Sequence, residues 1–441
     1  MGNLVAAGPV TAAGKRFVQA RRWGHRPGWA GRGAAARPPG GHNAVMDYLT
    51  ALGSLFAAEG RHDPYPAYDV IRAQAPVLRA PDERWYVTTH ALVNRLLRDT
   101  TMRLADAGDY DQFWPDWRQN RGVASVVLSM LQTNPPDHTR VRRAAATTFT
   151  PRRIAAMRDV IAAQAEELIT AMPAEADFMT AFAYPLPVGV ICALLGVPET
   201  DRPWFRQRAH DLTIVLEPIS TADEMHLADV AGRELEDYFT GLIADRQKHP
   251  QEDLTTALVE AGALSGEELL ANLVLLLVAG FETTANLLGT GLHLLLSQPA
   301  QAGRLRADPS LAPDVVEEIL RYDSPVQLTT RFATEPFEVD GIAVPAGAAL
   351  TMLLGSANRD PARYDDPHRF DPDRPNIQPV SFGGGAHYCL GAPLARMEAQ
   401  VALPLLLNRL PGLALNGDAV RRDRLVLRGY SEVPITTGIA S

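Results

Sequence analysis

FGGGAHYCLG, residues 382–391, decides how this sequence is interpreted, because it places one cysteine between a glycine-rich loop and a predicted helix. The N-terminus of a helix is electropositive and favours the thiolate form of Cys389. The glycines permit tight turns and let the backbone approach a flat ligand closely. A soft thiolate is a suitable ligand for iron. On these local features alone, haem ligation is one interpretation of Cys389 beside three others: a nucleophile, a redox thiol and an inert core cysteine.

The same stretch resembles the haem-binding loop of the cytochrome P-450 family, F-G-x-G-x-H-x-C-x-G. All six fixed positions of that pattern are present: Phe382, Gly383, Gly385, His387, Cys389 and Gly391. The resemblance implies that Cys389 is the axial ligand of haem b (heme b, iron protoporphyrin IX). It also implies that Phe382, Gly383, His387 and Gly391 contact this cofactor.

A second pattern, Glu318-x-x-Arg321, lies on a helix that Pro313 opens. The i,i+3 spacing puts both side chains on one helical face, where they can pair. Such pairs are common on surfaces, but this one lies about 70 residues before the cysteine loop, as in the cytochrome P-450 family. The resemblance implies a structural role under the haem with an arginine from a later loop. Arg369 is the first choice for that arginine, with Arg374 as the reserve.

The clearest predicted helix begins at Ser265 and ends near Ser297, before Gln298-Pro299. Ser265 and Glu268 form a capping box, S-x-x-E. The helix would be about 50 Å long at 1.5 Å per residue. Because it is apolar on nearly all sides, we expect it to cross the interior of the protein.

This helix contains AGFETT, residues 279–284. Threonine hydroxyls can bond back to the carbonyl one turn earlier and open the helix locally. An acid such as Glu282 is costly in an apolar stretch unless it has a partner or a task. A distorted helix with a paired glutamate is the structural alternative. The resemblance favours function and implies that Glu282 and Thr283 form the family's acid–alcohol pair for proton delivery, although Thr284 could be mistaken for Thr283.

The cluster DHTRVRR, residues 137–143, places His138 and Arg142 four residues apart on one helical face. Most basic clusters are solvated surfaces, but these two side chains can reach one anion together. In the cytochrome P-450 family this H-x-x-x-R pattern binds a haem propionate. Arg331 and His387 resemble the other propionate contacts, and haem brings two carboxylates for such cations.

Composition narrows the class of protein. The chain has 441 residues, a net charge of -9 and two cysteines, Cys192 and Cys389. Two distant cysteines make no disulfide framework and suit a reducing cytoplasm, so we expect a cytoplasmic protein. Residues 1–45 hold seven basic residues and no acid, so the remainder is strongly acidic, which argues against nucleic acid as a partner. The most apolar run, residues 269–281, is too short to span a membrane.

Residues 1–45 are rich in Gly, Ala and Pro, so we expect a disordered basic extension or sequence upstream of the natural start. Arg21-Arg22 suggests twin-arginine export, but no apolar segment follows it. The second segment, residues 46–441, is expected to form one large domain. The resemblance implies the cytochrome P-450 fold for it, mainly α with a smaller β-rich part, closest to soluble bacterial members.

The resemblance implies a monooxygenase that inserts one oxygen atom of O2 into a small hydrophobic substrate, by hydroxylation or epoxidation. A natural-product intermediate, polyketide or macrolide, is the guess from bacterial biosynthetic members. No flavin, nicotinamide or iron–sulfur motif appears, so ferredoxin and ferredoxin reductase are the expected electron donors. Arg140, Arg143 and Arg396 are candidate ferredoxin contacts, with ordinary surface charge as the alternative for each. The competing functions are a peroxide-driven peroxygenase, a non-catalytic haem-binding recruitment protein and a non-oxidative rearrangement.

Overall fold

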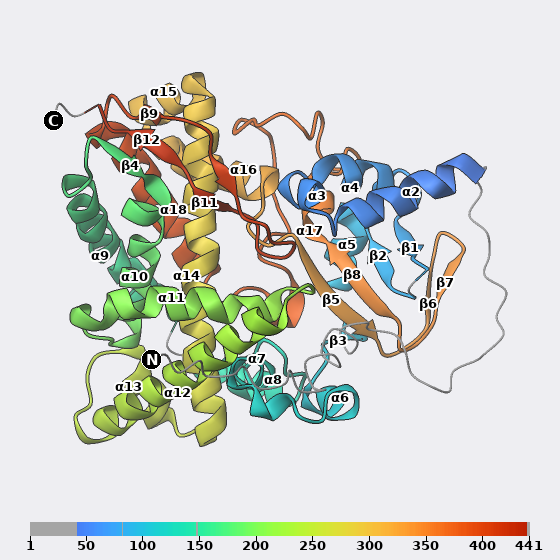
Figure 1. Ribbon diagram of the computed structural model, residues 1–441, viewed down its shortest axis with the longest axis horizontal. Coiled ribbons are helices and arrows are strands. Elements are labelled where there is room, and N and C mark those ends of the chain that lie inside the picture. The colour runs from blue at the N-terminus through green and yellow to red at the C-terminus, as the bar shows by residue number, and fades with distance from the viewer. Residues whose placement is uncertain (1–41, 82, 147–148, 439–441) are drawn as a thin grey trace, which may run out of the picture.

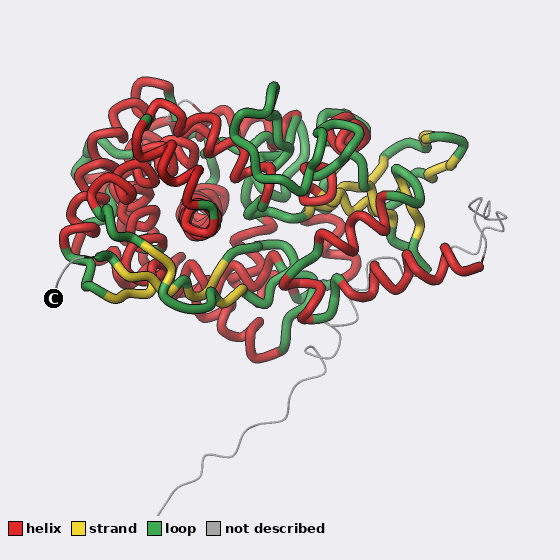
Figure 2. Tube along the Cα trace, turned by 90° about the horizontal axis from the view of Figure 1, so that it is seen from above, coloured by secondary structure: helices red, strands yellow, loops and turns green. Residues whose placement is uncertain are grey.

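The computed structural model describes residues 42–81, 83–146 and 149–438 (Figure 1). Most helices gather on one side of the molecule, and a five-stranded sheet with the first helices forms the other side. Figure 2 shows strands both in this sheet and along the edge of the helical part. The predicted architecture, mainly α with a smaller β-rich part, is confirmed.

The long helix α14 (Gly266–Ser297) passes through the centre of the helical part. It begins with the predicted capping box between Ser265 and Glu268. Helices α10 (Pro185–Leu195), α12 (Ala222–Lys248) and α18 (Ala392–Arg409) pack around it. Because neighbours cover nearly all of its sides, an apolar residue is favoured at almost every position of α14.

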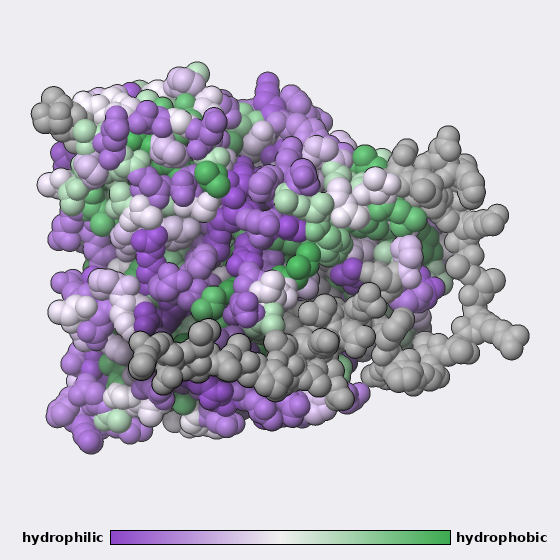
Figure 3. Space-filling view, in the orientation of Figure 1, coloured by the Kyte–Doolittle hydropathy of each residue, from purple (hydrophilic) through white to green (hydrophobic). Residues whose placement is uncertain are grey.

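Helix α14 is also long and apolar enough to cross a membrane, the one helix of this kind in the part of the chain that is described. Its most apolar window is 78% buried inside the protein, so its apolar side chains serve the core. The face of the molecule in Figure 3 is mainly hydrophilic over the helices at its left, with apolar residues scattered among them.

The sequence also predicts helices around residues 87–98, 137–146, 151–171, 189–196, 201–216 and 225–247, and each lies close to an observed helix, with ends shifted by a few residues. Helix α8 coincides with its prediction, and α18 continues on both sides of Pro404. The observed helices are α5 (His90–Leu96), α8 (Asp137–Ala146), α9 (Pro151–Thr170), α11 (Arg202–Leu212) and α16 (Ala312–Tyr322), together with α10, α12 and α18. Shorter helices connect them: α3 (Ala58–His62), α4 (Tyr65–Arg72), α6 (Ala107–Phe113), α7 (Arg121–Val127), α13 (Leu254–Ala261), α15 (Pro299–Ala307) and α17 (Leu354–Asn358).

The five-stranded sheet has the order β1-β2-β8-β5-β3. Only β2 and β8 pair in parallel, and the other neighbours are antiparallel. Its strands are β1 (Val77–Arg79), β2 (Trp85–Val87), β3 (Met102–Arg103), β5 (Leu328–Ala333) and β8 (Ala349–Leu353). Strand β5 carries Arg331, so this sheet presents one of the candidate haem contacts.

The smaller sheets connect distant parts of the chain. Asp340-Gly341 between two short apolar runs predicts a hairpin, and the structure contains it as β6 (Phe337–Val339) and β7 (Ile342–Val344). A three-stranded sheet joins β4 (Glu175–Asp177), β12 (Pro434–Thr436) and β9 (Ala414–Leu415), and β10 (Val420–Arg421) pairs with β11 (Tyr430–Glu432). These pairings bring the C-terminal segment against the helical part.

At the N-terminal end, the predicted boundary at residue 46 falls within α2 (His42–Ser54). The expectation of a disordered extension concerns mainly residues 1–41, which lie outside the described residues. Cys192 is fully buried in α10, as expected for a small apolar residue, and burial raises the pKa of its thiol to about 12.

Candidate functional site

Two glycines with positive φ shape the loop that carries Cys389. Gly383 has φ 70° and Gly385 has φ 64°, values that side chains other than glycine rarely adopt. A Cβ atom at Gly385 would also stand 2.5 Å from the carbonyl oxygen of Leu97. The loop then closes through a 2.9 Å hydrogen bond from the Cys389 N–H to the Phe382 carbonyl.

The thiol of Cys389 lies just before α18, where backbone N–H groups and an arginine surround it. Burial raises its pKa, while the backbone N–H groups of Gly391 and Ala392 and the nearby Arg142 act in the opposite direction. Arg142 also donates a 2.6 Å hydrogen bond to the Tyr388 carbonyl. These groups would stabilise a thiolate once a positive metal centre offsets the cost of burial.

Gly391 shows where a ligand could approach the cysteine. Its backbone angles, φ −81° and ψ 1°, are accessible to any residue, and a Cβ atom there would meet no atom of the chain within 4 Å. Neither the backbone conformation nor contacts with the described residues therefore require a glycine at position 391. The missing side chain leaves open space beside Cys389, and this space would allow a flat macrocycle to approach the cysteine closely.

Four basic side chains predicted as propionate contacts come together next to this loop: His138, Arg142, Arg331 and His387. The rings of His138 and His387 lie 3.9 Å apart, and His138 and Arg331 are buried. Burial first, and then the neighbouring cations, lower the pKa of His138 to about 4 and that of His387 to about 3. Burial also lowers the pKa of Arg331 to about 10.

No acid within the described residues offsets the positive charge of this cluster. Arg142 and Arg331 act on both His138 and His387, and His138 Nε2 is buried without a hydrogen-bond partner among the described residues. Arg331 finds only neutral partners, Thr329 Oγ1 and the Thr330 carbonyl, both at 2.9 Å. A buried guanidinium without an anion, such as that of Arg331, is costly, so the cluster fits a cofactor that brings carboxylates of its own.

The Glu318–Arg321 pair lies beneath this loop and is completely buried. Arg321 donates to both Glu318 oxygens at 2.6 and 2.8 Å and to the carbonyls of Asn358 and Pro367. The backbone N–H of Asp371 donates to Glu318 Oε1 at 2.8 Å. The pair therefore fixes the segment that leads into the cysteine loop.

The choice of Arg369 as the third member of this network is wrong, and the reserve, Arg374, takes the position. Arg374 Nε lies 3.2 Å from Glu318 Oε1, and its side chain is 7% exposed. The Arg369 side chain is 65% exposed and pairs with Asp366 and Asp371, while only its carbonyl faces the network. The loop turns between the two arginines, and sequence spacing alone does not reveal which one points inward.

The two threonine hydroxyls of α14 bond back to the backbone as expected, and the helix is continuous through this turn. Thr283 Oγ1 donates to the Ala279 carbonyl at 2.8 Å, and Thr284 Oγ1 donates to the Gly280 carbonyl at 3.0 Å. Thr284 is buried, whereas Thr283 retains exposed surface. Of the two hydroxyls, Thr283 is therefore the one that a ligand could reach.

Glu282 is buried on the same turn of α14 and contacts the guanidinium of Arg422. Neither carboxylate oxygen receives a hydrogen bond of regular geometry from the described residues. His210 Nδ1 lies 3.8 Å from Glu282 Oε1. The sequence motifs pointed to neither Arg422 nor His210, because each is an ordinary basic residue far from Glu282 along the chain.

Comparison with known proteins agrees with this geometry. A family model described as Cytochrome P450 matches residues 206–419. The chain is 39% identical to cytochrome P450 monooxygenase PikC of Streptomyces venezuelae, over 92% of the chain and 96% of PikC. It is 37% identical to 6-deoxyerythronolide B hydroxylase of Saccharopolyspora erythraea, over 88% of the chain and 99% of the relative.

A solved structure gives the same fold. The crystal structure of P450BioI in complex with hexadec-9Z-enoic acid ligated acyl carrier protein has a TM-score of 0.81 and 33% sequence identity. The match covers 86% of this chain and 100% of that one. The likeness therefore extends over nearly the whole described part of the chain, including both sides of the candidate site.

Proposed function

This chain belongs to the cytochrome P450 family of haem-thiolate monooxygenases, which use haem b, and on that premise we propose that Cys389 ligates the iron and that the enzyme oxidises a natural-product intermediate. The observation that carries the ligand assignment is the cluster of two arginines and two histidines beside the cysteine loop, to which no carboxylate of the described residues is paired. Bound there, haem b supplies oxygen activation at a thiolate-ligated iron. His138, Arg142, Arg331 and His387 would hold its propionates.

The Glu282–Thr283 pair is proposed to hold and move protons on the opposite side of the haem. Thr283 Oγ1 is accessible, and Glu282 is a buried acid beside it in the sequence. A hydroxyl can both accept and donate a hydrogen bond, so Thr283 can orient water and pass a proton that Glu282 supplies. The pair also distinguishes this enzyme from the peroxide-driven alternative, which has no need of protons from an acid–alcohol pair.

Thr283→Ala tests this role. We expect the variant to bind haem and substrate normally but to divert about tenfold more of its reducing equivalents to hydrogen peroxide, because the proton-donating hydroxyl is lost. Thr284→Ala is the matched control, since its hydroxyl makes the same kind of bond one residue away. Equal product yield per electron in Thr283→Ala and the parent enzyme would exclude the role, and efficient turnover with peroxide alone would favour the peroxygenase.

We propose a polyketide or macrolide intermediate as the substrate, oxidised by hydroxylation or epoxidation. The support is the likeness to 6-deoxyerythronolide B hydroxylase over nearly all of both chains. The P450BioI complex adds a second form of substrate, one ligated to a carrier protein. A panel of free macrolactones and carrier-bound acyl chains, screened by the change in the Soret band on binding, distinguishes the two forms.

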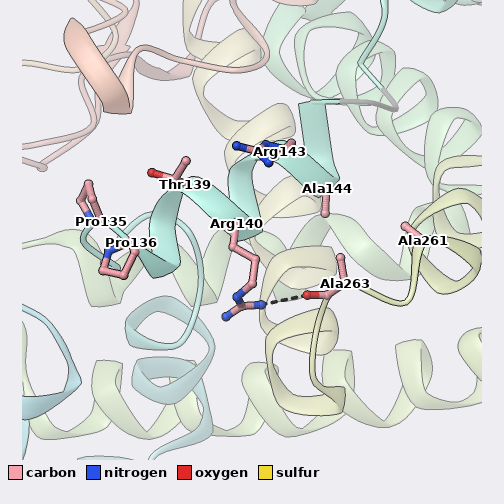
Figure 4. Close-up of a pocket in the computed structure, with 8 residues that line it drawn as sticks. All are labelled: Pro135, Pro136, Thr139, Arg140, Arg143, Ala144, Ala261 and Ala263. Atoms are coloured by element: carbon pink, nitrogen blue, oxygen red, sulfur yellow. Dashed lines mark hydrogen bonds between the residues drawn. The ribbon is translucent and has the colours of Figure 1, made fainter.

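Electrons are proposed to come from a ferredoxin and its reductase in the cytoplasm. Of the three candidate arginines, Arg140 is engaged with Glu268 and the Ala263 carbonyl, and Arg396 is engaged with Glu317. Arg143 is exposed and has no ionic partner among the residues described. Figure 4 shows Arg140 reaching across to Ala263 in the pocket that α8 forms with the segment after α13. Arg143 is therefore the arginine most available to an acidic partner.

Arg143→Glu should raise the KM for ferredoxin about tenfold at low salt, with a smaller effect at high salt, because the contact is electrostatic. The control is Arg158→Glu on α9, which makes the same change of charge at another exposed position. If both variants raise the KM equally, Arg143 has no specific part in docking.

A further inference from the structure

A buried polar cluster connects the acid on α14 to a histidine on another helix. Glu282 is 1% exposed, and Arg422 reaches it from the segment between β10 and β11. His210 of α11 approaches both residues: its Nδ1 atom lies 3.8 Å from Glu282 Oε1 and 3.4 Å from Arg422 Nη2. Three separate elements thus place an acid, a guanidinium and an imidazole together.

Only one of the two basic groups can exchange protons with Glu282. A guanidinium remains protonated in proteins and serves as a fixed charge. The imidazole of His210 can accept and donate a proton, and its side chain is 37% exposed whereas that of Glu282 is 1% exposed. Within the cluster, His210 is therefore the group that meets both water and the buried acid.

The charges around His210 keep its ring neutral. Burial, and after it Arg422, lower the pKa of His210 to about 4. Arg424 and Arg206 act in the same direction, and Asp211 opposes them. A neutral ring can accept a hydrogen bond at Nδ1 from Arg422, which is the contact seen. A ring with so low a proton affinity also releases an acquired proton readily.

Glu282 itself is held by charge and not by a fixed hydrogen-bond pattern. The Arg422 guanidinium contacts the carboxylate, but neither oxygen receives a regular hydrogen bond from the described residues. Both carboxylate oxygens of Glu282 therefore retain the capacity to accept a proton or a hydrogen bond. An acid that gives protons away on one side needs a supply on the other.

We propose that His210 resupplies Glu282 with protons from water, and that Arg422 positions both side chains. This proposal rests on the proton-delivery role proposed for Glu282. With the ring turned towards solvent, Nδ1 takes one proton from a hydronium ion, which leaves as water; the ring then turns back and gives that proton to a Glu282 oxygen. The carboxylate becomes a neutral acid and the ring returns to its neutral form; one proton is transferred and no electron moves. His210 is thus a positioning and relay residue, not a catalytic one.

Two substitutions separate the relay from a packing role. His210→Gln keeps a side-chain acceptor for Arg422 but cannot carry a proton, whereas His210→Leu removes both properties. The relay predicts that both variants lower the product formed per electron about tenfold and raise the solvent deuterium isotope effect on turnover. His226→Gln is the control, because His226 is exposed on α12 away from this cluster.

Substrate binding, followed by the Soret change, and the reduced carbon monoxide spectrum should remain unchanged in His210→Gln. If His210→Gln matches the parent enzyme in product yield and isotope effect, the relay is refuted, whatever His210→Leu does. If His210→Leu fails to fold, His210→Gln alone decides.

Glu282→Gln separates failure of this proposal from failure of the proposed function. A normal product yield in Glu282→Gln overturns proton delivery by the acid itself. A defective Glu282→Gln with a normal His210→Gln leaves the acid in place and overturns only its supply. If both single variants are defective, the relay predicts that the double variant, His210→Gln with Glu282→Gln, forms as much product per electron as Glu282→Gln alone.

Discussion

Arg374→Met is expected to destabilise the protein strongly, because the substitution removes a buried cation from the network around Glu318. Arg374 lies 3.2 Å from Glu318 Oε1 and donates to the carbonyls of Arg369 at 2.7 Å and Asp366 at 2.5 Å. Its side chain is 7% exposed, and Glu318 is completely buried. Removing one partner of a buried ion pair costs about 3–5 kcal/mol.

The expected cost lies at the lower end of this range, about 3 kcal/mol, because Arg321 still pairs with Glu318 in the variant. That cost corresponds to a change of about 100-fold in the unfolding equilibrium. Guanidinium unfolding of the haem-loaded protein, followed by far-ultraviolet circular dichroism and by the Soret band, measures both the loss of fold and the loss of haem.

Arg369→Met is the matched control. Its own side chain is 65% exposed and remains screened by water in both ion pairs, so we expect a loss below about 1 kcal/mol. If Arg369→Met lowers the free energy of unfolding as much as Arg374→Met does, the inward placement of Arg374 is refuted. Arg369 would then be the arginine that supports the Glu318 network.

Three other outcomes are expected. Cys389→Ser should lose the red-shifted Soret band of the reduced carbon monoxide complex, and a retained band would overturn the ligand assignment. Gly385→Ala should cost about 2–3 kcal/mol and weaken haem retention, since φ is 64° and the added Cβ would meet the Leu97 carbonyl; an unchanged thermal midpoint would contradict this. Burial disfavours the charged form of Asp323, but Arg421, Arg428 and Arg359 outweigh it and lower its pKa. Asp323 should therefore stabilise the fold above about pH 4, the unfolded value, and lose this effect as the pH falls, and Asp323→Asn should flatten the acid limb of a stability–pH curve.

The features that could be predicted from the sequence depend on local order along the chain. The glycine loop before Cys389 and the capping box at Ser265 are short patterns in which each residue acts on its neighbours. Helix α14 could be predicted at both ends because its cap and its terminating Gln298-Pro299 flank one continuous apolar run.

The features that could not be predicted depend on how distant segments meet. Arg369 and Arg374 differ only in how one loop turns, and the sequence offers no periodicity there. Arg422 and His210 reach Glu282 from two elements far apart in the chain, and neither belongs to a short motif. A buried acid indicates that a partner exists, but only the fold identifies it.

The burial of α14 on nearly all sides also has a consequence for synthesis of the protein. The helix ends at Ser297, whereas α18, which packs against it, is complete only at Arg409. While the ribosome makes the intervening residues, α14 presents an apolar surface long enough to resemble a membrane segment. The nascent chain should therefore depend on holding chaperones over this interval, and variants that slow the docking of α18 should aggregate during expression even where the finished fold is stable.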